Sequence, residues 1–251
     1  MPESADNQQR LYRDLAWVWP IISPPEHYAE ETGHFCKIIK KYAQIQVKTL
    51  LHLGCGGGHN DHFLQEHFKV TGIDISQAML GLARQLNPGI AYHLGDMRSV
   101  RLAMTFDAVT LLDSVCYMLT ENDLAAAFTT AFEHLSPGGV LLTAPDFTAE
   151  SFQQNKSSCR TCHKGDVEIV FLENYYDPDP TDTTYESTFI YLVRRAGHLQ
   201  VETDRHLCGI FPSRTWRRLQ KKAGFQVKQS EFKITGNDPA TYPLFIGIKP
   251  L

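Results

Sequence analysis

The sequence has no long hydrophobic run and no block of basic residues. Its apolar stretches are only a few residues long, whereas a transmembrane helix needs roughly 20. The net charge is −4 and the pI about 6.2, without a cluster of Lys and Arg, which argues against a nucleic-acid backbone as partner. The opening segment MPESADNQQR is polar and lacks a signal-like apolar core. We therefore expect a cytoplasmic protein that binds neither membrane nor nucleic acid.

Cysteine is also scarce, and its spacing suggests no disulfide framework. In a cytoplasmic chain of 251 residues with ordinary globular composition, scattered cysteines are expected to be free thiols. There are six: Cys36, Cys55, Cys116, Cys159, Cys162 and Cys208. We find no internal repeat, low-complexity tract or linker, which favours one large domain or a domain with an insertion.

One cysteine motif resembles a metal or haem site. Cys159, Cys162 and His163 match the c-type haem attachment pattern and provide three metal ligands. Haem attachment requires export to an oxidising compartment, and zinc would require a fourth ligand such as His198 or His206. We expect a chance match in a loop and no bound metal.

A glycine-rich turn after a short apolar run is the most informative feature. Residues 47–53 predict a buried strand, and residues 54–58, GCGGG, let the chain turn tightly and let a ligand approach closely. A helical pattern follows the turn. The free backbone N–H groups of such a strand–turn–helix unit favour an anionic group.

A second strand, residues 70–74, ends in an acidic residue. Asp74 follows Gly54 by about 20 residues, the offset at which nucleotide-binding folds place a carboxylate against ribose hydroxyls. The alternative is a helix N-cap, because a helix begins near Ser76. The upstream glycine turn favours ribose binding.

The ends of two further strands also carry candidate ligand groups. Gly95, Asp96 and Met97 follow residues 90–94 and suit an adenine ring, although an ordinary turn is the alternative. Asp113, Ser114 and Tyr117 follow residues 106–112 at the carboxyl edge where parallel sheets bind ligands. We expect the reacting end of the pocket there.

The order of the elements predicts the fold. Alternating strands and helices predict a Rossmann-like, doubly wound α/β sheet of seven strands. A terminal antiparallel hairpin closes it, and an antiparallel β insertion follows the fifth strand. The expected strands are residues 47–53, 70–74, 90–94, 106–112, 140–144, 225–232 and 244–249, with 167–173, 184–193 and 198–210 in the insertion. The expected helices are residues 8–19 (ended by prolines), 27–42, 76–86, 122–135 and 213–223, the last capped by Ser213; residues 136–139 are expected to form a turn.

We expect a single domain, residues 1–251, with four parts. These are an N-terminal lid (1–34), a cofactor-binding core (35–148), the antiparallel insertion (149–211), and a C-terminal helix and hairpin that complete the core (212–251).

These motifs together resemble class I S-adenosylmethionine-dependent methyltransferases. The resemblance rests on LHLGCGGG, Asp74, GDM at 95–97, SPGG at 136–139 and the terminal hairpin. The insertion, the segment YLVRRAGHLQVETDRHLCGIF and the ending LFIGIK are most similar to small-molecule N-methyltransferases, notably aminosugar N,N-dimethyltransferases. The resemblance implies in-line methyl transfer from S-adenosyl-L-methionine to a small molecule, with an amine nitrogen as the expected acceptor.

The resemblance also implies roles for individual residues. Asp74 would hold the ribose, Asp96 the adenine amino group, and Tyr117 would face the reacting amine. The full set implied at the cofactor is Trp19, Tyr28, Gly54, Cys55, Gly56, Asp74, Ile75, Met79, Gly95, Asp96, Met97 and Leu112. Tyr117, His206 and Asp113 are the expected catalytic residues, which orient the acceptor or take its proton; Asp113 stands where those relatives often carry serine.

Three alternatives stay open at this point. An O-methyltransferase would use the same core on a hydroxyl group. An NAD-dependent oxidoreductase shares the glycine turn, but its fingerprint requires a small residue where His59 stands. A protein that binds the cofactor without turnover has the same motifs. An exposed insertion hairpin also offers an edge for a homodimer.

Overall fold

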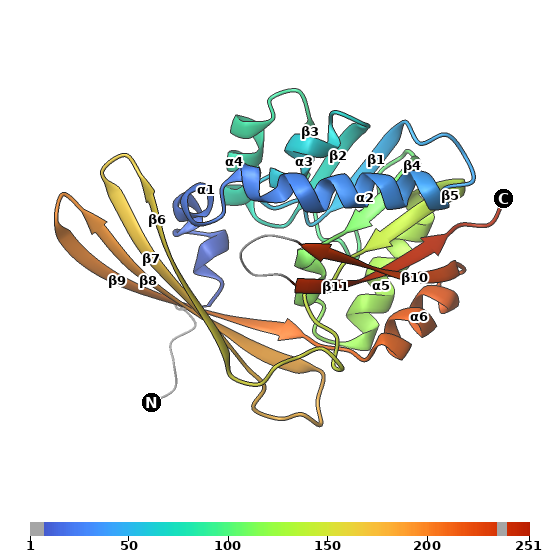
Figure 1. Ribbon diagram of the computed structural model, residues 1–251. Coiled ribbons are helices and arrows are strands. Elements are labelled where there is room, and N and C mark those ends of the chain that lie inside the picture. Colours follow the sequence, from blue (N-terminus) through green and yellow to red (C-terminus); the bar gives the residue numbers. More distant parts are fainter. Residues whose placement is uncertain (1–7, 235–239) are drawn as a thin grey trace.

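Two β-sheets form the framework of the computed structural model, which describes residues 8–234 and 240–251 (Figure 1). The larger sheet has seven strands in the order β10-β11-β5-β4-β1-β2-β3. Its strands are β1 Thr49–Leu53, β2 Lys69–Asp74, β3 Ala91–Leu94, β4 Phe106–Leu111, β5 Leu135–Thr143, β10 Gln226–Ile234 and β11 Ala240–Ile248. The expected doubly wound sheet with a terminal antiparallel hairpin is thereby confirmed, since β1 to β5 pair in parallel and β10 and β11 antiparallel.

Helices cover both faces of this sheet and enclose two apolar cores. α2, α3 and α4 pack on one face, while α5 and α6 pack on the other. Their bounds are α2 Ala29–Tyr42, α3 His59–Leu64, α4 Gln77–Leu86, α5 Glu121–His134 and α6 Ser213–Lys222. No helix in the described part of the chain is long and apolar enough to cross a membrane.

The strand order reverses between β1 and β4. The chain proceeds from β1 through β2 to β3, and then returns to place β4 on the other side of β1. Ligands of doubly wound sheets bind in the crevice at the carboxyl ends of the strands that flank such a reversal. The glycine turn and Leu112 therefore both face the expected pocket.

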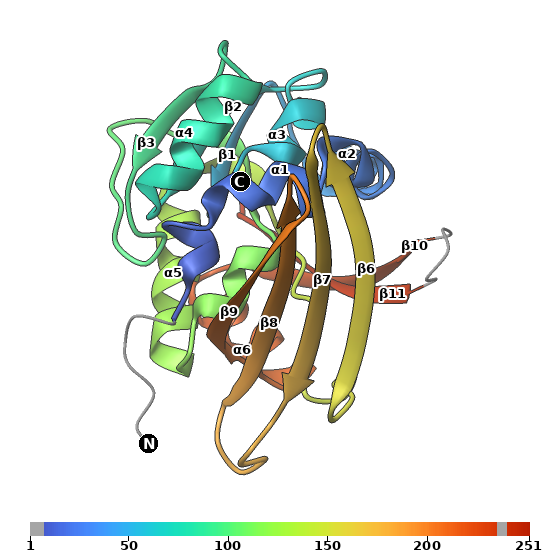
Figure 2. The ribbon, with the colours of Figure 1, turned by 90° about the vertical axis from the view of Figure 1, so that its left-hand side faces the viewer.

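The insertion forms a second, four-stranded antiparallel sheet in the order β6-β7-β8-β9, seen face-on in Figure 2. Its strands are β6 Lys156–Lys164, β7 Val167–Tyr176, β8 Thr184–Arg195 and β9 His198–Gly209. The sequence did not predict β6. The Cys159–His163 motif, which we expected in a loop, lies on this strand. Alternation along the strand places Cys159 and Cys162 on opposite faces, and no cluster able to hold a metal occurs among the described residues.

The expected helix over residues 8–19 is wrong. The segment contains short turns, η2 Arg10–Tyr12 and η3 Ala16–Val18, followed by the helical turn α1 Trp19–Ile22 and by η4 Pro25–Tyr28. Pro20 stands in the first turn of α1, where a missing N–H is harmless, and so begins a helix where we expected it to end one. Hydrogen bonds to Asp204 draw the backbone of Arg10 and Leu11 onto β9 instead.

Two smaller expectations are also corrected. Pro212 is the N-cap of α6, and the backbone N–H of Ser213 donates to the carboxylate of Glu150. The expected turn at residues 136–139 falls within β5, where Gly138 adopts φ 76°.

Candidate active site

The glycine turn between β1 and α3 is tightly built. Gly54 has φ 77°, and a Cβ added there would lie 2.0 Å from Ser114 Oγ. Gly56 has φ 53° and faces open space, since no heavy atom lies within 4 Å of an added Cβ. The turn thus has packing on one side and room for a ligand on the other.

Asp74 links the end of β2 to this turn. Its Oδ2 accepts from the backbone N–H of Gly56 (2.7 Å), and its Oδ1 accepts from that of Ser76 (2.8 Å). Burial raises the pKa of Asp74, against the effect of these two hydrogen bonds. Ser76 is the residue whose side chain caps α4, by accepting from Met79 N–H. Capping therefore does not account for Asp74, whose carboxylate borders a cavity instead.

That cavity, of about 80 Å³, lies at the carboxyl ends of β1 and β4. Many of the expected cofactor residues line it: Trp19, Tyr28, Gly54, Cys55, Gly56, Asp74, Met79 and Leu112, together with Asp113. The other lining residues are Gly57 of the glycine turn, Ser114 at the expected reacting end, Tyr12 of the expected lid, and His52, His59 and Asn60. No sequence motif selected His52 or Asn60 for this site.

Four expected cofactor residues lie outside the cavity lining. Ile75 is 70% exposed, and Gly95 donates its N–H to the backbone oxygen of Asp74 (3.0 Å). Asp96 is held by Arg98, whose hydrogen bonds lower the pKa of that carboxyl group. Met97 packs against Gly54. All four follow the carboxyl ends of β2 and β3 in the sequence.

Two aromatic side chains pack on His59 beside the glycine turn. Trp19 stacks on His59 with ring centroids 5.7 Å apart, and Tyr28 meets the same imidazole edge-on at 5.3 Å. Burial lowers the pKa of His59 to about 4, so the ring is neutral at physiological pH. A neutral ring is compatible with a cationic ligand nearby.

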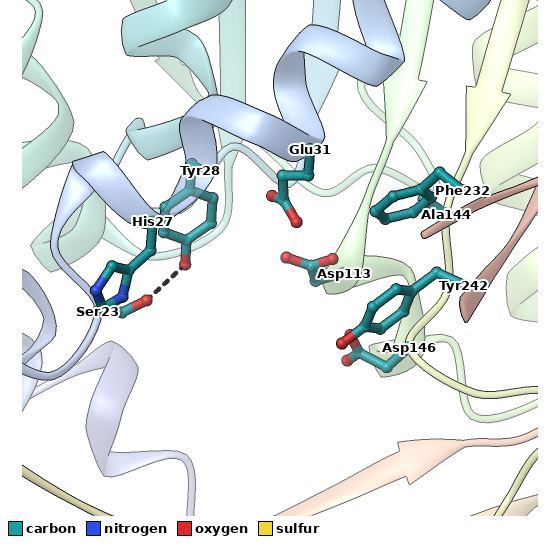
Figure 3. Close-up of a pocket in the computed structure, with 9 residues that line it drawn as sticks. All are labelled: Ser23, His27, Tyr28, Glu31, Asp113, Ala144, Asp146, Phe232 and Tyr242. Carbon is teal, nitrogen blue, oxygen red and sulfur yellow. Dashed lines mark hydrogen bonds between the residues drawn. The ribbon is translucent and has the colours of Figure 1, made fainter. Parts of the chain in front are cut away.

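A second cavity, of about 170 Å³, lies beside the first (Figure 3). Tyr28 and Asp113 line both cavities. Figure 3 shows the carboxylates of Glu31 and Asp113 facing each other across this space, with Asp146 on the same side as Tyr242. The expected catalytic residue Asp113 therefore lies where the two spaces meet.

The carboxyl groups of this second cavity have raised pKa values. Burial, reinforced by the charge of Asp113, raises the pKa of Glu31 to about 9. Burial raises the pKa of Asp113, and burial together with the charge of Asp113 raises that of Asp146 well above its usual value. Within the described residues, Glu31 Oε1 is buried without a hydrogen-bond partner. A carboxyl group with a raised pKa holds its proton more readily, so these groups are candidates for proton exchange with a ligand in the cavity.

The other two expected catalytic residues contact each other. The Tyr117 hydroxyl lies 2.7 Å from His206 Nδ1 and 3.0 Å from the hydroxyl of Tyr12. His206 is fully buried, and its Nε2 lies 2.8 Å from Asp204 Oδ2. Neither Tyr117 nor His206 lines either cavity, so this chain of polar groups reaches the cofactor cavity through Tyr12.

Comparisons with known proteins show which sequences this chain resembles. Residues 50–139 match the family model described as a methyltransferase domain. The chain is 29% identical over 223 residues to dTDP-3-amino-3,4,6-trideoxy-alpha-D-glucopyranose N,N-dimethyltransferase of Streptomyces venezuelae, covering 88% of this chain and 91% of the relative. It is 26% identical to dTDP-4-amino-2,3,4,6-tetradeoxy-D-glucose N,N-dimethyltransferase of Saccharopolyspora spinosa, covering 88% and 86%.

Two solved structures have a fold similar to that of this chain. The crystal structure of Streptomyces venezuelae DesVI superposes with a TM-score of 0.81 at 25% identity and covers 100% of both chains. The S-adenosylmethionine-bound structure of CalS10, an amino pentose methyltransferase from Micromonospora echinaspora, superposes with a TM-score of 0.75 at 25% identity, covering 88% of this chain and 91% of that one.

Proposed function

We propose that this chain, which is an S-adenosylmethionine-dependent methyltransferase, transfers a methyl group to an amine nitrogen of a small molecule. The cofactor supplies the methyl group as an electrophile on a sulfonium centre, so the protein needs no covalent intermediate. The task of the protein is to align a neutral nitrogen with that methyl group and to exclude water.

The residues present fit the cofactor. Open space over Gly56 leaves room for its amino-acid end, and the Asp74 carboxylate is placed to accept from ribose hydroxyls. Trp19 and Tyr28 would cover the glycine turn, and Leu112 would border the reacting centre. We propose that Ile75, Asp96 and Met97 contact the adenine from the β3 side of the crevice.

The carboxylate-lined cavity is the observation that favours an amine acceptor. An amine that enters as an ammonium ion must lose a proton before its lone pair can attack. An ammonium ion that lies beside Glu31 favours the ionised form of this carboxyl group, and because the pKa of Glu31, about 9, is close to that of an aliphatic ammonium, the ionised group can take that proton at little cost in free energy. The neutral nitrogen would then be free to attack the methyl group that the cofactor supplies, and the methylated ammonium would lose its excess proton to a second carboxylate or to solvent. An aliphatic hydroxyl group is far less acidic than an ammonium ion and would gain little from such groups.

The same cavity suggests an acceptor without phosphate groups. Among the described lining residues there is neither Lys nor Arg, whereas three carboxylates are present. A diphosphate such as that of the relatives' dTDP-sugar substrates would find no Lys or Arg partner there and would have to lie outside. We therefore expect unphosphorylated amines to be the better acceptors.

A methyl-transfer screen tests this function. Release of S-adenosylhomocysteine would be measured with simple amines, free aminosugars, nucleotide-linked aminosugars and phenols. We expect turnover with unphosphorylated amines, and we expect Asp113→Asn to raise the KM for the amine more than the KM for the cofactor. Turnover with phenols alone would refute the amine proposal, and turnover with nucleotide-linked sugars alone would refute the phosphate argument.

We further propose a cytoplasmic location and a homodimer. All six cysteines are free thiols, as expected in a reducing compartment. β6 forms one edge of the four-stranded sheet, and edge strands of two copies can pair to continue a sheet. Light scattering would measure the mass in solution, and a mass of one chain at micromolar concentration would refute the dimer.

A further inference from the structure

Asp204 is a buried carboxylate that holds three hydrogen-bond donors from two separate parts of the chain. It lies on β9, only 1% exposed. Its Oδ1 accepts from the backbone N–H of Arg10 (2.8 Å), and its Oδ2 accepts from that of Leu11 (2.7 Å) and from His206 Nε2 (2.8 Å). A carboxylate buried this deeply is stable only when its oxygens are satisfied, and here they are.

The two backbone donors belong to the segment that covers the cofactor cavity. This segment, η2, lies between the four-stranded sheet and the core (Figure 1). Tyr12 follows the two donors directly and lines the cofactor cavity. Its backbone oxygen accepts from Ser76 Oγ (2.6 Å) at the start of α4. The covering segment is thus attached to the insertion by Asp204 and to the core by Ser76.

The third donor begins the chain of polar groups that ends at the cavity. Because Asp204 can only accept, His206 Nε2 must carry a hydrogen. The His206 ring is thereby fixed with Nδ1 toward the Tyr117 hydroxyl, which in turn contacts the hydroxyl of Tyr12. The rings of Tyr12 and Tyr117 meet edge-on with centroids 5.4 Å apart. The position of the Tyr12 hydroxyl therefore depends on Asp204 along two routes, through the backbone and through the side chains.

We propose that Asp204 is a positioning residue for methyl transfer. It holds the N-terminal segment over the cofactor cavity and orients the His206–Tyr117–Tyr12 chain. Asp204 touches neither cavity and acts through residues that do. This inference rests on the proposed methyl transfer for its catalytic part, but its effect on cofactor binding is independent of the acceptor.

The test compares three variants of the full-length protein. Asp204→Asn removes the charge and replaces one acceptor oxygen by a donor, so we expect cofactor affinity measured by calorimetry to fall about tenfold or more. Hydrogen exchange of residues 9–18 should accelerate in this variant. Tyr117→Phe keeps the backbone attachment, so it should lower kcat while cofactor affinity changes by less than about twofold.

Glu202→Gln is the matched control. Glu202 lies on the same strand and binds the guanidinium of Arg10 at 2.6 Å, but it does not bind the backbone of the segment. We expect its cofactor affinity and hydrogen exchange to match those of the parent protein. Equal weakening in Glu202→Gln and Asp204→Asn would overturn the proposal, as would parental cofactor affinity in Asp204→Asn.

A second pair of variants covers the case in which Asp204→Asn does not fold. His206→Gln and Tyr117→Phe leave the backbone attachment in place, and both should show reduced kcat with nearly unchanged cofactor affinity. Parental kcat in both variants would refute the side-chain route. Because calorimetry with the cofactor needs no acceptor, a wrong acceptor class would leave the cofactor-affinity results intact.

Discussion

Replacing Glu31 by Gln should stabilise the protein at neutral and alkaline pH. Burial and the charge of Asp113 raise the pKa of Glu31 from 4.5 to about 9 in the folded chain. The unfolded chain has the ordinary value, so between pH 4.5 and 9 the folded state binds more protons than the unfolded state. Stability contributed by this group is fully present below pH 4.5 and is lost as the pH rises toward 9.

The magnitude follows from that difference. Each pKa unit corresponds to about 1.4 kcal/mol, which gives an upper bound of roughly 3 kcal/mol at pH 7. Glu31 is partly open to the cavity, and solvent there screens its charge, so we expect about 1–2 kcal/mol. Glutamine keeps the shape of the side chain but has no charge to desolvate. The gain in stability should therefore grow with pH.

Urea denaturation of both proteins at pH 5 and pH 8 measures the effect. We expect Glu31→Gln to be more stable than the parent at pH 8 and nearly equal to it at pH 5. Glu66→Gln, an exposed change at the end of α3, serves as control and should alter stability little at either pH. A stability difference for Glu31→Gln that is absent at pH 8, or equal at both pH values, would refute the reasoning.

Three further predictions concern the cofactor site and the Tyr117–His206 pair. Asp74→Ala should abolish cofactor binding in calorimetry, because it removes the acceptor for the ribose; tight binding would contradict this assignment. His206→Ala should slow turnover with cofactor affinity nearly unchanged, as Tyr117→Phe should; loss of binding would place His206 in contact with the cofactor. Gly54→Ala should destabilise the protein and weaken cofactor binding, because φ is 77° and no room exists for a Cβ, whereas Gly89→Ala, with open space around it, should behave like the parent in thermal unfolding and binding.

The sequence predicted those parts of the fold that have a local pattern. Short apolar runs ending in glycine or aspartate marked β1 and β2, and Asp74 indeed lies at the glycine turn. The sequence did not predict β6, because most of its residues are exposed and KSSCRTCHK therefore has no hydrophobic alternation. The N-terminal segment was expected to form a helix that ends at the prolines. Attachment to Asp204, 194 residues away, determines its path instead.

The sequence could not predict the second cavity, which Glu31, Asp113 and Asp146 line, for a similar reason. Asp113 was selected because it follows a strand end, where ligand residues gather. Glu31 lies within an amphipathic helix and Asp146 in a connection after β5, and no motif links either of them to Asp113. Only the packing of α2 beside the ends of β4 and β5 brings the three carboxyl groups to one space.

The attachment of the N-terminal segment to β9 has a consequence for protein engineering. Substrate range is commonly altered by exchanging an inserted module between related enzymes. A graft of residues 149–211 alone would separate Asp204 from the backbone N–H groups of Arg10 and Leu11. The N-terminal segment of the recipient would then lack the carboxylate that holds it. A working chimera should therefore take both segments from the same parent, although most of the catalytic core lies between them in the sequence.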